Sequence, residues 1–207
     1  MGTITALQRQ RRRRDRVSVF IDDEYAFSLA LEVAATLRRG QELTDADIER
    51  LTERDEYASA LDRSMRYLSY RPRSRREIER YLDEREVPPP TRDAVLERLM
   101  DLGLVDDEAF AGWWVRNRSE HKPRGALALR SELVECGVPD RIIGGALAGL
   151  DEDALATRLA LAQGERYAGL PREQFDRRLG GYLSRRGFRY EAVRSALARA
   201  WRQVSEG

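Results

Sequence analysis

The stretch Leu133-Val-Glu-Cys-Gly-Val138 has the pattern of a helix end, and a similar pattern occurs twice more in the chain. A leucine and, five residues later, an apolar residue recur at intervals of 51 and 50 residues: Leu82 and Val87, Leu133 and Val138, Leu183 and Phe188. In the second and third copies glycine precedes the apolar residue, as is common just after the last turn of a helix. A period of this size is typical of a helical solenoid, although a single irregular bundle with a coincidental register would give the same spacing.

Each of these leucines lies in the second of three predicted helices. Apolar residues three and four positions apart mark one face of each helix. They are Ala58, Leu61, Met65 and Leu68, then Ile78 and Leu82, then Val95, Leu99 and Leu102; Phe110 and Trp114, then Leu129 and Leu133, then Ile143 and Leu147; Leu155 and Leu159, then Leu179 and Leu183, then Val193, Leu197 and Trp201. Ser74-Arg-Arg-Glu77 predicts a capping box at the start of one second helix, and Val87-Pro-Pro-Pro90 ends that helix because proline has no N–H to donate.

The first 56 residues have a different pattern. After the arginine run of residues 9–16, Val17-Ser-Val-Phe-Ile21 and Tyr25-Ala-Phe-Ser-Leu29 predict a β-hairpin with an acidic turn. Leu31 to Arg39 reads as a short helix closed by Gly40, and Thr44 with Asp47 predicts the cap of another helix.

The predicted fold class is therefore all-α, with three tandem three-helix repeats and a small N-terminal β-hairpin and helix extension. The predicted parts are residues 1–56 (basic arm, hairpin and linking helices), 57–106 (first repeat), 107–150 (second repeat) and 151–207 (third repeat).

The composition indicates a globular protein with a highly charged surface. The 207 residues include 37 basic and 36 acidic side chains, a net charge of +1, and Lys122 is the only lysine. Arginine presents a rigid fork of donors that suits phosphates and carboxylates, although a genomic base composition that favours arginine codons would give the same excess. No stretch approaches the roughly 20 apolar residues of a membrane span, and no apolar segment of a secretory signal follows the N-terminal arginines. We expect a cytoplasmic protein that acts as a monomer without membrane contact.

The sequence favours a protein without catalytic activity, cofactor or metal. It has no glycine-rich phosphate loop and no paired histidines at metal-ligand spacing. His121, the only histidine, lies in a polar stretch, and the single cysteine, Cys136, has no visible partner for a reaction. The acidic groups Asp106-Asp107-Glu108 and Asp151-Glu-Asp153 occupy the same step of successive repeats, which favours a role at helix N-termini, where acidic groups offset the helix dipole.

Basic residues are the remaining functional candidates. Each repeat places arginines from its first helix into or along its second. The candidates for binding a partner or DNA are Arg66, Arg71, Arg73, Arg75 and Arg76; Arg116, Arg118, Lys122 and Arg124; and Arg177, Arg178, Arg185, Arg186 and Arg189. Interleaved aromatics such as Tyr67, Tyr70 and Tyr182 would suit contact with nucleic acid. Alternatively, the aromatics belong to the core and the arginines cover them with their aliphatic stems.

Two stretches resemble the RecX family of RecA-recombinase regulators. The segment from Ala60 to Leu82 is similar to the opening repeat of that family, and the segment Gly103-Leu-Val-Asp-Asp-Glu-Ala-Phe-Ala-Gly-Trp-Trp-Val-Arg-Asn-Arg118 resembles its most recognisable part. Lys122-Pro-Arg-Gly125 continues the match, which covers roughly residues 57–201 and leaves the N-terminal arm and hairpin outside. Glu86, where the family usually has glycine, and the three prolines at 88–90 depart from the family pattern.

The resemblance implies a curved, elongated array of the three repeats that lodges in the groove of the RecA–DNA filament. It further implies that the protein limits the ATPase and strand-exchange activities of RecA, with single- or double-stranded DNA contacted directly or through RecA. Three other functions stay open: a stand-alone nucleic-acid-binding repeat protein, a helical adaptor between two proteins, and a metal-dependent nuclease.

Overall fold

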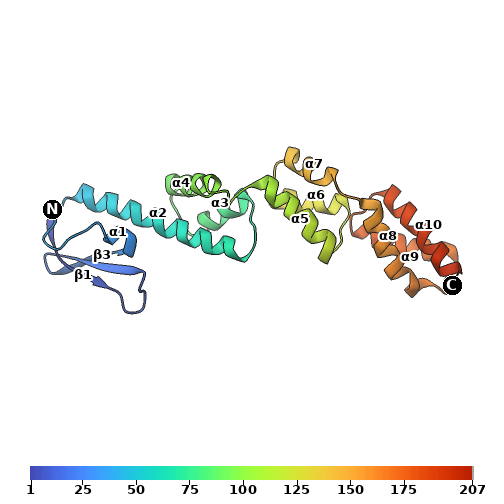
Figure 1. Ribbon diagram of the computed structural model, residues 1–207, viewed down its shortest axis with the longest axis horizontal. Helices are drawn as coiled ribbons and strands as arrows, with labels where there is room; N and C mark the ends of the chain where they lie inside the picture. The colour runs from blue at the N-terminus through green and yellow to red at the C-terminus, as the bar shows by residue number, and fades with distance from the viewer. Residues whose placement is uncertain (207) are drawn as a thin grey trace. The chain divides into compact units, whose positions relative to one another are not determined.

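The computed structural model describes residues 1–206, which form four strands and ten α-helices (Figure 1). In chain order the elements are β1 (Gly2–Arg9), β2 (Arg16–Ile21), β3 (Glu24–Ala30), α1 (Leu31–Ala34), β4 (Glu42–Leu43), α2 (Asp45–Tyr70), α3 (Arg75–Asp83), α4 (Pro89–Asp101), α5 (Asp107–His121), α6 (Ala126–Glu135), α7 (Asp140–Ala148), α8 (Glu152–Gly164), the 3₁₀ turn η1 (Glu165–Tyr167), α9 (Arg172–Arg185) and α10 (Tyr190–Glu206). The chain divides into two compact units, one of residues 1–72 and 78–105 and the other of residues 73–77 and those from 106 onward.

The predicted hairpin is confirmed as β2 and β3, but it is part of a larger sheet. The four strands are antiparallel in the order β3-β2-β1-β4. Asp22 and Asp23, with φ of 49° and 67°, form the turn between β2 and β3, as expected for a two-residue hairpin loop in which both residues need positive φ. Part of the N-terminal arm is therefore strand β1, whose Ile4 is completely buried, and the β-branched run Thr3-Ile4-Thr5 was the missed signal.

The helix predicted over residues 31–39 is shorter than expected, because α1 ends at Ala34. The N–H of Gly40 donates to the carbonyl of Ile4 (2.7 Å), and the N–H of Ile4 donates to the carbonyl of Gln41 (2.9 Å). These bonds align the chain with β1 and lead into β4, so pairing across the sheet replaces the last helical turns.

Helix α2 begins at the predicted cap and is long enough to belong to both the sheet region and the first repeat. The Thr44 hydroxyl accepts from the N–H of Asp47, while the Asp47 carboxylate accepts from the N–H and hydroxyl of Thr44, and these bonds lower the pKa of Asp47 to about 2. The helix continues through residues 56 and 57 without a break. Asp55, on this helix, pairs with Arg16 of β2 at 2.8 Å and accepts from the N–H of Ala30, which attaches the sheet to α2.

Each helical repeat has its own core, and we refer to α2–α4, α5–α7 and α8–α10 as the first, second and third repeats. Buried residues between Ala60 and Val105 form the first core, those between Phe110 and Ile143 the second, and those between Leu155 and Ala200 the third. A fourth core joins the sheet to α1 and to Leu51 of α2. Leu150, just before α8, packs against both the second and the third core. The prediction of three three-helix repeats with an N-terminal extension is confirmed.

The three second helices end in the same way, as the sequence period predicts. The N–H groups of Val87, Val138 and Phe188 donate to the carbonyls of Leu82, Leu133 and Leu183 at 3.2, 3.0 and 3.4 Å. The residue before each donor has a positive φ, of 56° at Glu86, 78° at Gly137 and 79° at Gly187. This is the Schellman geometry of a helix C-terminus, and the departure from the family at Glu86 does not change it. Among residues 1–206, none of the helices combines the length and apolar character that a membrane crossing requires.

Candidate functional site

In the second repeat, a single carboxylate holds two of the candidate arginines. One oxygen of Glu132, on α6, accepts from the Nε1 of Trp114 and from the Nε of Arg118, both at 2.8 Å, and its other oxygen lies 3.7 Å from the Nε of Arg124. The guanidinium of Arg118 also lies over the Trp114 ring, 4.6 Å from its centroid. Arg118 therefore joins α5 to α6, and Arg124 joins the α5–α6 loop to α6. Trp114 is half-buried against the core as part of this network.

The other two candidates of the second repeat are available to a partner. Arg116, on α5, and Lys122, just after it, are exposed, and their side chains have no hydrogen-bond or salt-bridge partner within residues 1–206. Arg116 lines a cleft of about 500 Å³ between α5 and the start of α8, together with Arg158. A cation that the protein does not neutralise is free to meet an external anion.

In the third repeat, helix α9 has one buried and one basic face. Phe175, Leu179 and Leu183, at intervals of four, are fully buried. Arg178 and Arg185 are exposed and seven residues apart, so they lie on one face about 10.5 Å from each other along the helix. Arg177 is exposed beside them, and none of the three forms a salt bridge within the described part of the chain.

Arg186, by contrast, contributes to the contact between the second and third repeats, whereas Arg189 is bound within the third repeat. The Nη1 of Arg186 donates to the carbonyl of Pro123 (3.3 Å), and its guanidinium lies over the Tyr182 ring at 4.7 Å. The N–H of Arg189 donates to Glu152 (2.9 Å), whose second oxygen is 3.8 Å from the Arg189 Nε.

The candidates of the first repeat are in several environments. Arg66 pairs with Asp62 one turn earlier on α2, at 2.7 Å, and both side chains are exposed. Arg71 follows α2, and its Nη1 donates to the carbonyl of Pro72 (2.8 Å). Arg73 pairs with Glu77 at 3.3 Å in a largely buried position. The predicted capping box is confirmed, because Ser74 and Glu77 exchange hydrogen bonds of 3.1 Å.

The remaining two first-repeat candidates, Arg75 and Arg76, lie against the second repeat's elements. The backbone N–H of Arg75 donates to Asp107 of α5 (2.9 Å). The side chain of Arg76 lies so close to Gly137 that a Cβ placed on that glycine would be 2.4 Å from the Arg76 Cβ. Residues at equivalent steps of the sequence period thus have different surroundings.

The acidic groups have a role that sequence reasoning found only in part. Asp106 and Asp151 cap their own helices α5 and α8, as expected. The next residue of each group accepts from a different helix: Asp107 from the N–H of Arg75, and Glu152 from the N–H of Ala126 at the start of α6 (3.0 Å). In both repeats an acidic residue directly follows the capping aspartate, and this recurrence was the sequence signal that could have predicted the second role.

The acidic residues, His121 and Cys136 were the residues considered for catalysis. Within residues 1–206 no three His, Cys, Asp or Glu side chains are grouped so that they could hold a metal ion. His121 is exposed at the end of α5, with its Nδ1 3.1 Å from the carbonyl of Asn117. Cys136 is half-buried, and its carbonyl accepts from the Ser74 hydroxyl at 2.6 Å.

Most aromatic side chains are packed rather than displayed. Tyr67 stacks on Tyr81 with ring centroids 4.2 Å apart, and Trp201 packs against Phe175 at 5.1 Å. The candidate Tyr70 is exposed at 84%, and Tyr190, at the start of α10, is exposed at 77%.

Comparisons with known proteins agree with this architecture. The family model described as "Regulatory protein RecX N-terminal domain" matches residues 2–44, "RecX, first three-helix domain" matches residues 60–99, and "RecX, second three-helix domain" matches residues 106–147. The first of these corrects the expectation that the N-terminal region lies outside the resemblance, since it covers the sheet.

Similar proteins and structures cover nearly the whole chain. The "Regulatory protein RecX" of Bacillus subtilis (strain 168) is 32% identical over 204 residues, which are 95% of this chain and 76% of the relative. The protein of the same name from Listeria monocytogenes is 29% identical over 202 residues, 95% of this chain and 75% of the relative. A solved structure, "Crystal structure of regulatory protein RecX", has 27% identity and a TM-score of 0.71 and covers 98% of this chain and 100% of its own. The chain belongs to the RecX family of regulatory proteins.

Proposed function

We propose that this protein binds the RecA–DNA filament and limits the ATPase and strand-exchange activities of RecA. Membership of the RecX family supports the regulatory role. The observation that carries the binding mode is the set of exposed cations without an ion pair within residues 1–206, on α5, directly after it and on α9. A filament offers acidic protein surface and phosphate, and both attract such cations.

Arg116 and Lys122 form one contact region in this proposal, and Arg177, Arg178 and Arg185 form the other. Arg118 and Arg124 have structural roles, because their bonds to Glu132 hold α5 and the α5–α6 loop against α6. Changing all four basic residues of the second repeat together would therefore combine an effect on binding with an effect on folding. Changing Arg116 and Lys122 alone separates the two.

The test is the ATPase rate of RecA on single-stranded DNA, titrated with this protein at a low and a high salt concentration. We expect inhibition that weakens as salt rises, because counterions released from phosphate drive much of such binding. Arg116→Gln with Lys122→Gln, and separately Arg177→Gln, Arg178→Gln and Arg185→Gln together, should each require more protein for half-inhibition. Arg194→Gln with Arg202→Gln on α10 is the matched control and should inhibit like the wild type.

The outcomes also separate the other functions that the sequence left open. An unchanged ATPase rate at both salt concentrations would contradict the proposal. Bare DNA bound as tightly as RecA-coated DNA would favour a stand-alone nucleic-acid-binding protein, and binding of RecA with complete indifference to DNA would favour an adaptor. DNA cleavage that needs Mg²⁺ and stops with a chelator would indicate a nuclease.

A further inference from the structure

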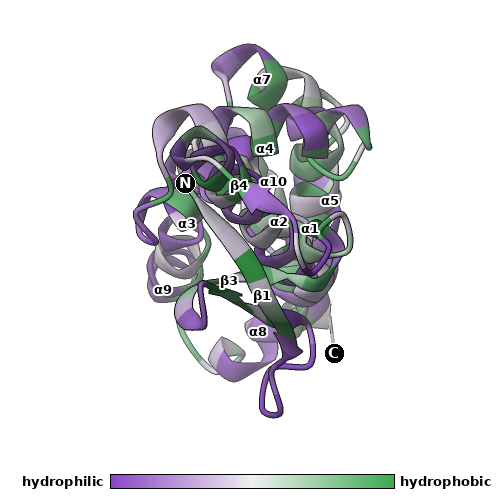
Figure 2. Ribbon diagram, turned by 90° about the vertical axis from the view of Figure 1, so that its left-hand side faces the viewer, coloured by the Kyte–Doolittle hydropathy of each residue, from purple (hydrophilic) through white to green (hydrophobic). Residues whose placement is uncertain are grey.

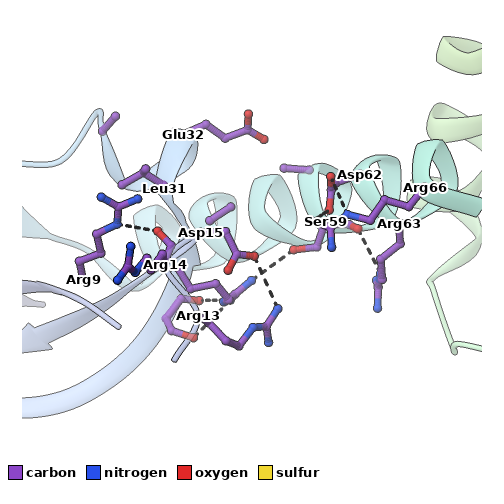
Figure 3. A pocket seen from close by; sticks show the side chains of 15 residues that line it. Arg9, Arg13, Arg14, Asp15, Leu31, Glu32, Ser59, Asp62, Arg63 and Arg66 are labelled. Atoms are coloured by element: carbon purple, nitrogen blue, oxygen red, sulfur yellow. Dashed lines mark hydrogen bonds and ion pairs between the residues drawn. The ribbon is translucent and has the colours of Figure 1, made fainter. Parts of the chain in front are cut away.

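A cleft of the first unit lies between the β1–β2 loop and α2, and its lining is rich in arginine. Its volume is about 910 Å³, and the lining residues come from the loop and the adjoining ends of β1 and β2, from β3 and α1, and from the second half of α2 (Figure 3). The loop is hydrophilic along its length and extends beyond the sheet (Figure 2). None of the candidate residues except Arg66 lies here.

The charges of the cleft do not balance. Six arginines line it, Arg9, Arg13, Arg14, Arg16, Arg63 and Arg66, against the three carboxylates of Asp15, Glu32 and Asp62. Arg16 is already neutralised by Asp55, outside the lining, in a pair whose side chains are both 13% exposed. The pairs Arg13–Asp15 (3.9 Å) and Arg66–Asp62 (2.7 Å) are exposed on both sides, so each contributes little energy and can exchange for another anion.

Three guanidinium groups in the cleft have no ion pair. Within residues 1–206 no carboxylate lies within salt-bridge distance of Arg9, Arg14 or Arg63. The Nε of Arg9 donates to the carbonyl of Arg14 (2.6 Å), and the Nε of Arg63 donates to the carbonyl of Ser59 (3.1 Å). These bonds orient the two guanidinium groups and leave their Nη atoms without an acceptor in the described chain. They can donate in pairs to the oxygens of an external anion.

The two walls of the cleft favour an extended anion with several charges. Arg9, Arg13 and Arg14 come from the loop side, whereas Arg63 and Arg66 are three residues apart on α2 and therefore on one helix face. The lining contains no aromatic ring on which a base could stack, and its apolar members are alanines and Leu31. It offers no apolar pocket for the side chains of a bound peptide.

We propose that this cleft binds the phosphodiester backbone of DNA without reading its base sequence. Arg14 and Arg63 contact phosphates from opposite walls, with Arg9 and Arg13 beside Arg14 and Arg66 beside Arg63. The ligand is DNA itself, so the proposal does not depend on a role toward RecA. It gives the first unit a nucleic-acid contact of its own, separate from the cations on α5 and α9.

The test uses the full chain, without RecA, and a fluorescently labelled oligonucleotide, as a single strand and as a duplex of the same sequence. Fluorescence anisotropy over a salt series gives the slope of log K against log salt. Arg14→Gln with Arg63→Gln removes two phosphate contacts and should reduce that slope by about 1.4 for the single strand, or about 1.8 for the duplex. At 0.1 M salt a change of 1.4 corresponds to binding about 25-fold weaker. Whichever DNA, the single strand or the duplex, shows the reduced slope with the cleft variant is the ligand of the cleft.

The matched control is Arg38→Gln with Arg39→Gln, which removes the same charge from exposed positions of the same unit outside the cleft. It should leave the slope at its wild-type value, and both variants should melt at the wild-type temperature. Equal slopes for the cleft variant and the wild type would overturn the proposal. So would a cleft variant that binds bare DNA normally but inhibits RecA less, because the cleft would then hold an acidic protein segment. If the wild type binds DNA, the cleft variant shows the reduced salt slope, and the wild type leaves the RecA ATPase rate unchanged, only the proposed function would be contradicted.

Discussion

Two contacts in the second unit occupy the same step of the repeat but are built differently. In the Ser74 contact, which we define as residues 74–76 against Cys136 and Gly137, the Ser74 side chain donates to the carbonyl of Cys136. In the Gly125 contact, residues 125–128 against residues 186–188, backbone meets backbone. The N–H groups of Gly125 and Leu127 donate to the carbonyls of Arg186 and Gly187 at 2.9 and 3.1 Å. Ser74 and Gly125 are equivalent positions, 51 residues apart.

The difference shows how much freedom one repeat position has. A Cβ on Gly125 would lie 2.3 Å from the backbone of Gly187 and Phe188, so only glycine permits the direct backbone contact. At the equivalent position, the Ser74 side chain keeps the two backbones apart, and its hydroxyl connects them by donating to the carbonyl of Cys136. In both contacts the turn on the accepting side contains a glycine with positive φ, Gly137 or Gly187. Glu86 is the equivalent residue of the first repeat. Four predictions test this comparison.

The largest effect is expected from Gly187→Ala. The change forces a positive φ on alanine and places its Cβ 2.4 Å from the backbone nitrogen of Ala128, so the free energy of unfolding should fall by about 3 kcal/mol. Gly137→Ala meets the Arg76 side chain instead and should cost about 2 kcal/mol. Urea denaturation measures both. Gly144→Ala, in α7 with open space around it, is the control and should stabilise by about 0.5–1 kcal/mol. Equal costs at 187 and 137 would remove the distinction between the two contacts.

Ser74→Ala should break the Ser74 contact with the next largest effect. The fully buried hydroxyl donates to Cys136 and accepts from the N–H of Glu77, and its removal leaves both groups without that partner. We expect a loss of about 2 kcal/mol in the free energy of unfolding, measured by urea denaturation. Ser131→Ala, exposed on α6, should change stability by less than about 0.5 kcal/mol. A similar small value for Ser74→Ala would mean that the side-chain bridge does not stabilise the contact.

Glu152→Gln should weaken the Gly125 contact to a smaller extent. Glutamine keeps an oxygen that can accept from the N–H groups of Ala126 and Arg189 but loses the charge that favours the start of α6. The expected loss is about 1 kcal/mol, because the Glu152 side chain is only 13% exposed. Asp107→Asn, in the more exposed bond to Arg75, should cost about 0.5 kcal/mol. Thermal denaturation of both variants in low salt gives the comparison, and a larger cost for Asp107→Asn would reverse it.

The smallest effect should come from Glu86→Gly, and its sign is opposite. Glu86 has a φ of 56° and is exposed, so glycine relieves the left-handed strain and should stabilise the protein by about 0.5–1 kcal/mol. Glu84→Gly, two residues earlier at a negative φ, should destabilise by a similar amount. A melting temperature that falls in both variants would show that the side chain of Glu86 contributes more than its backbone strain costs.

Local patterns predicted a large part of the fold. The β2–β3 hairpin, the caps at Thr44 and Ser74 and the shared helix ends after Leu82, Leu133 and Leu183 all depend on residues within about six positions of one another. Strands β1 and β4 and the early end of α1 escaped prediction, because the bonds that Ile4 forms with Gly40 and Gln41 join residues far apart in sequence.

The candidate site was predicted less completely, for the same reason. The sequence indicated which segments are basic, but the positions of the carboxylates decide which guanidinium groups remain available. Glu132 pairs with Arg118 of α5 and with Arg124 of the α5–α6 loop, and Asp55 pairs with Arg16 of the sheet. The grouping of Arg9, Arg14 and Arg63 in one cleft follows only from the packing of the sheet beside α2.

By itself the sequence determined the repeat, its period and its helix ends, since hydrophobic spacing and backbone capping act over short distances along the chain. The tertiary structure alone decided which turns receive a neighbouring backbone and which cations stay unpaired. Both depend on atoms that folding brings within a few ångströms of each other. The local sequence around one residue does not indicate which distant residues will lie beside it.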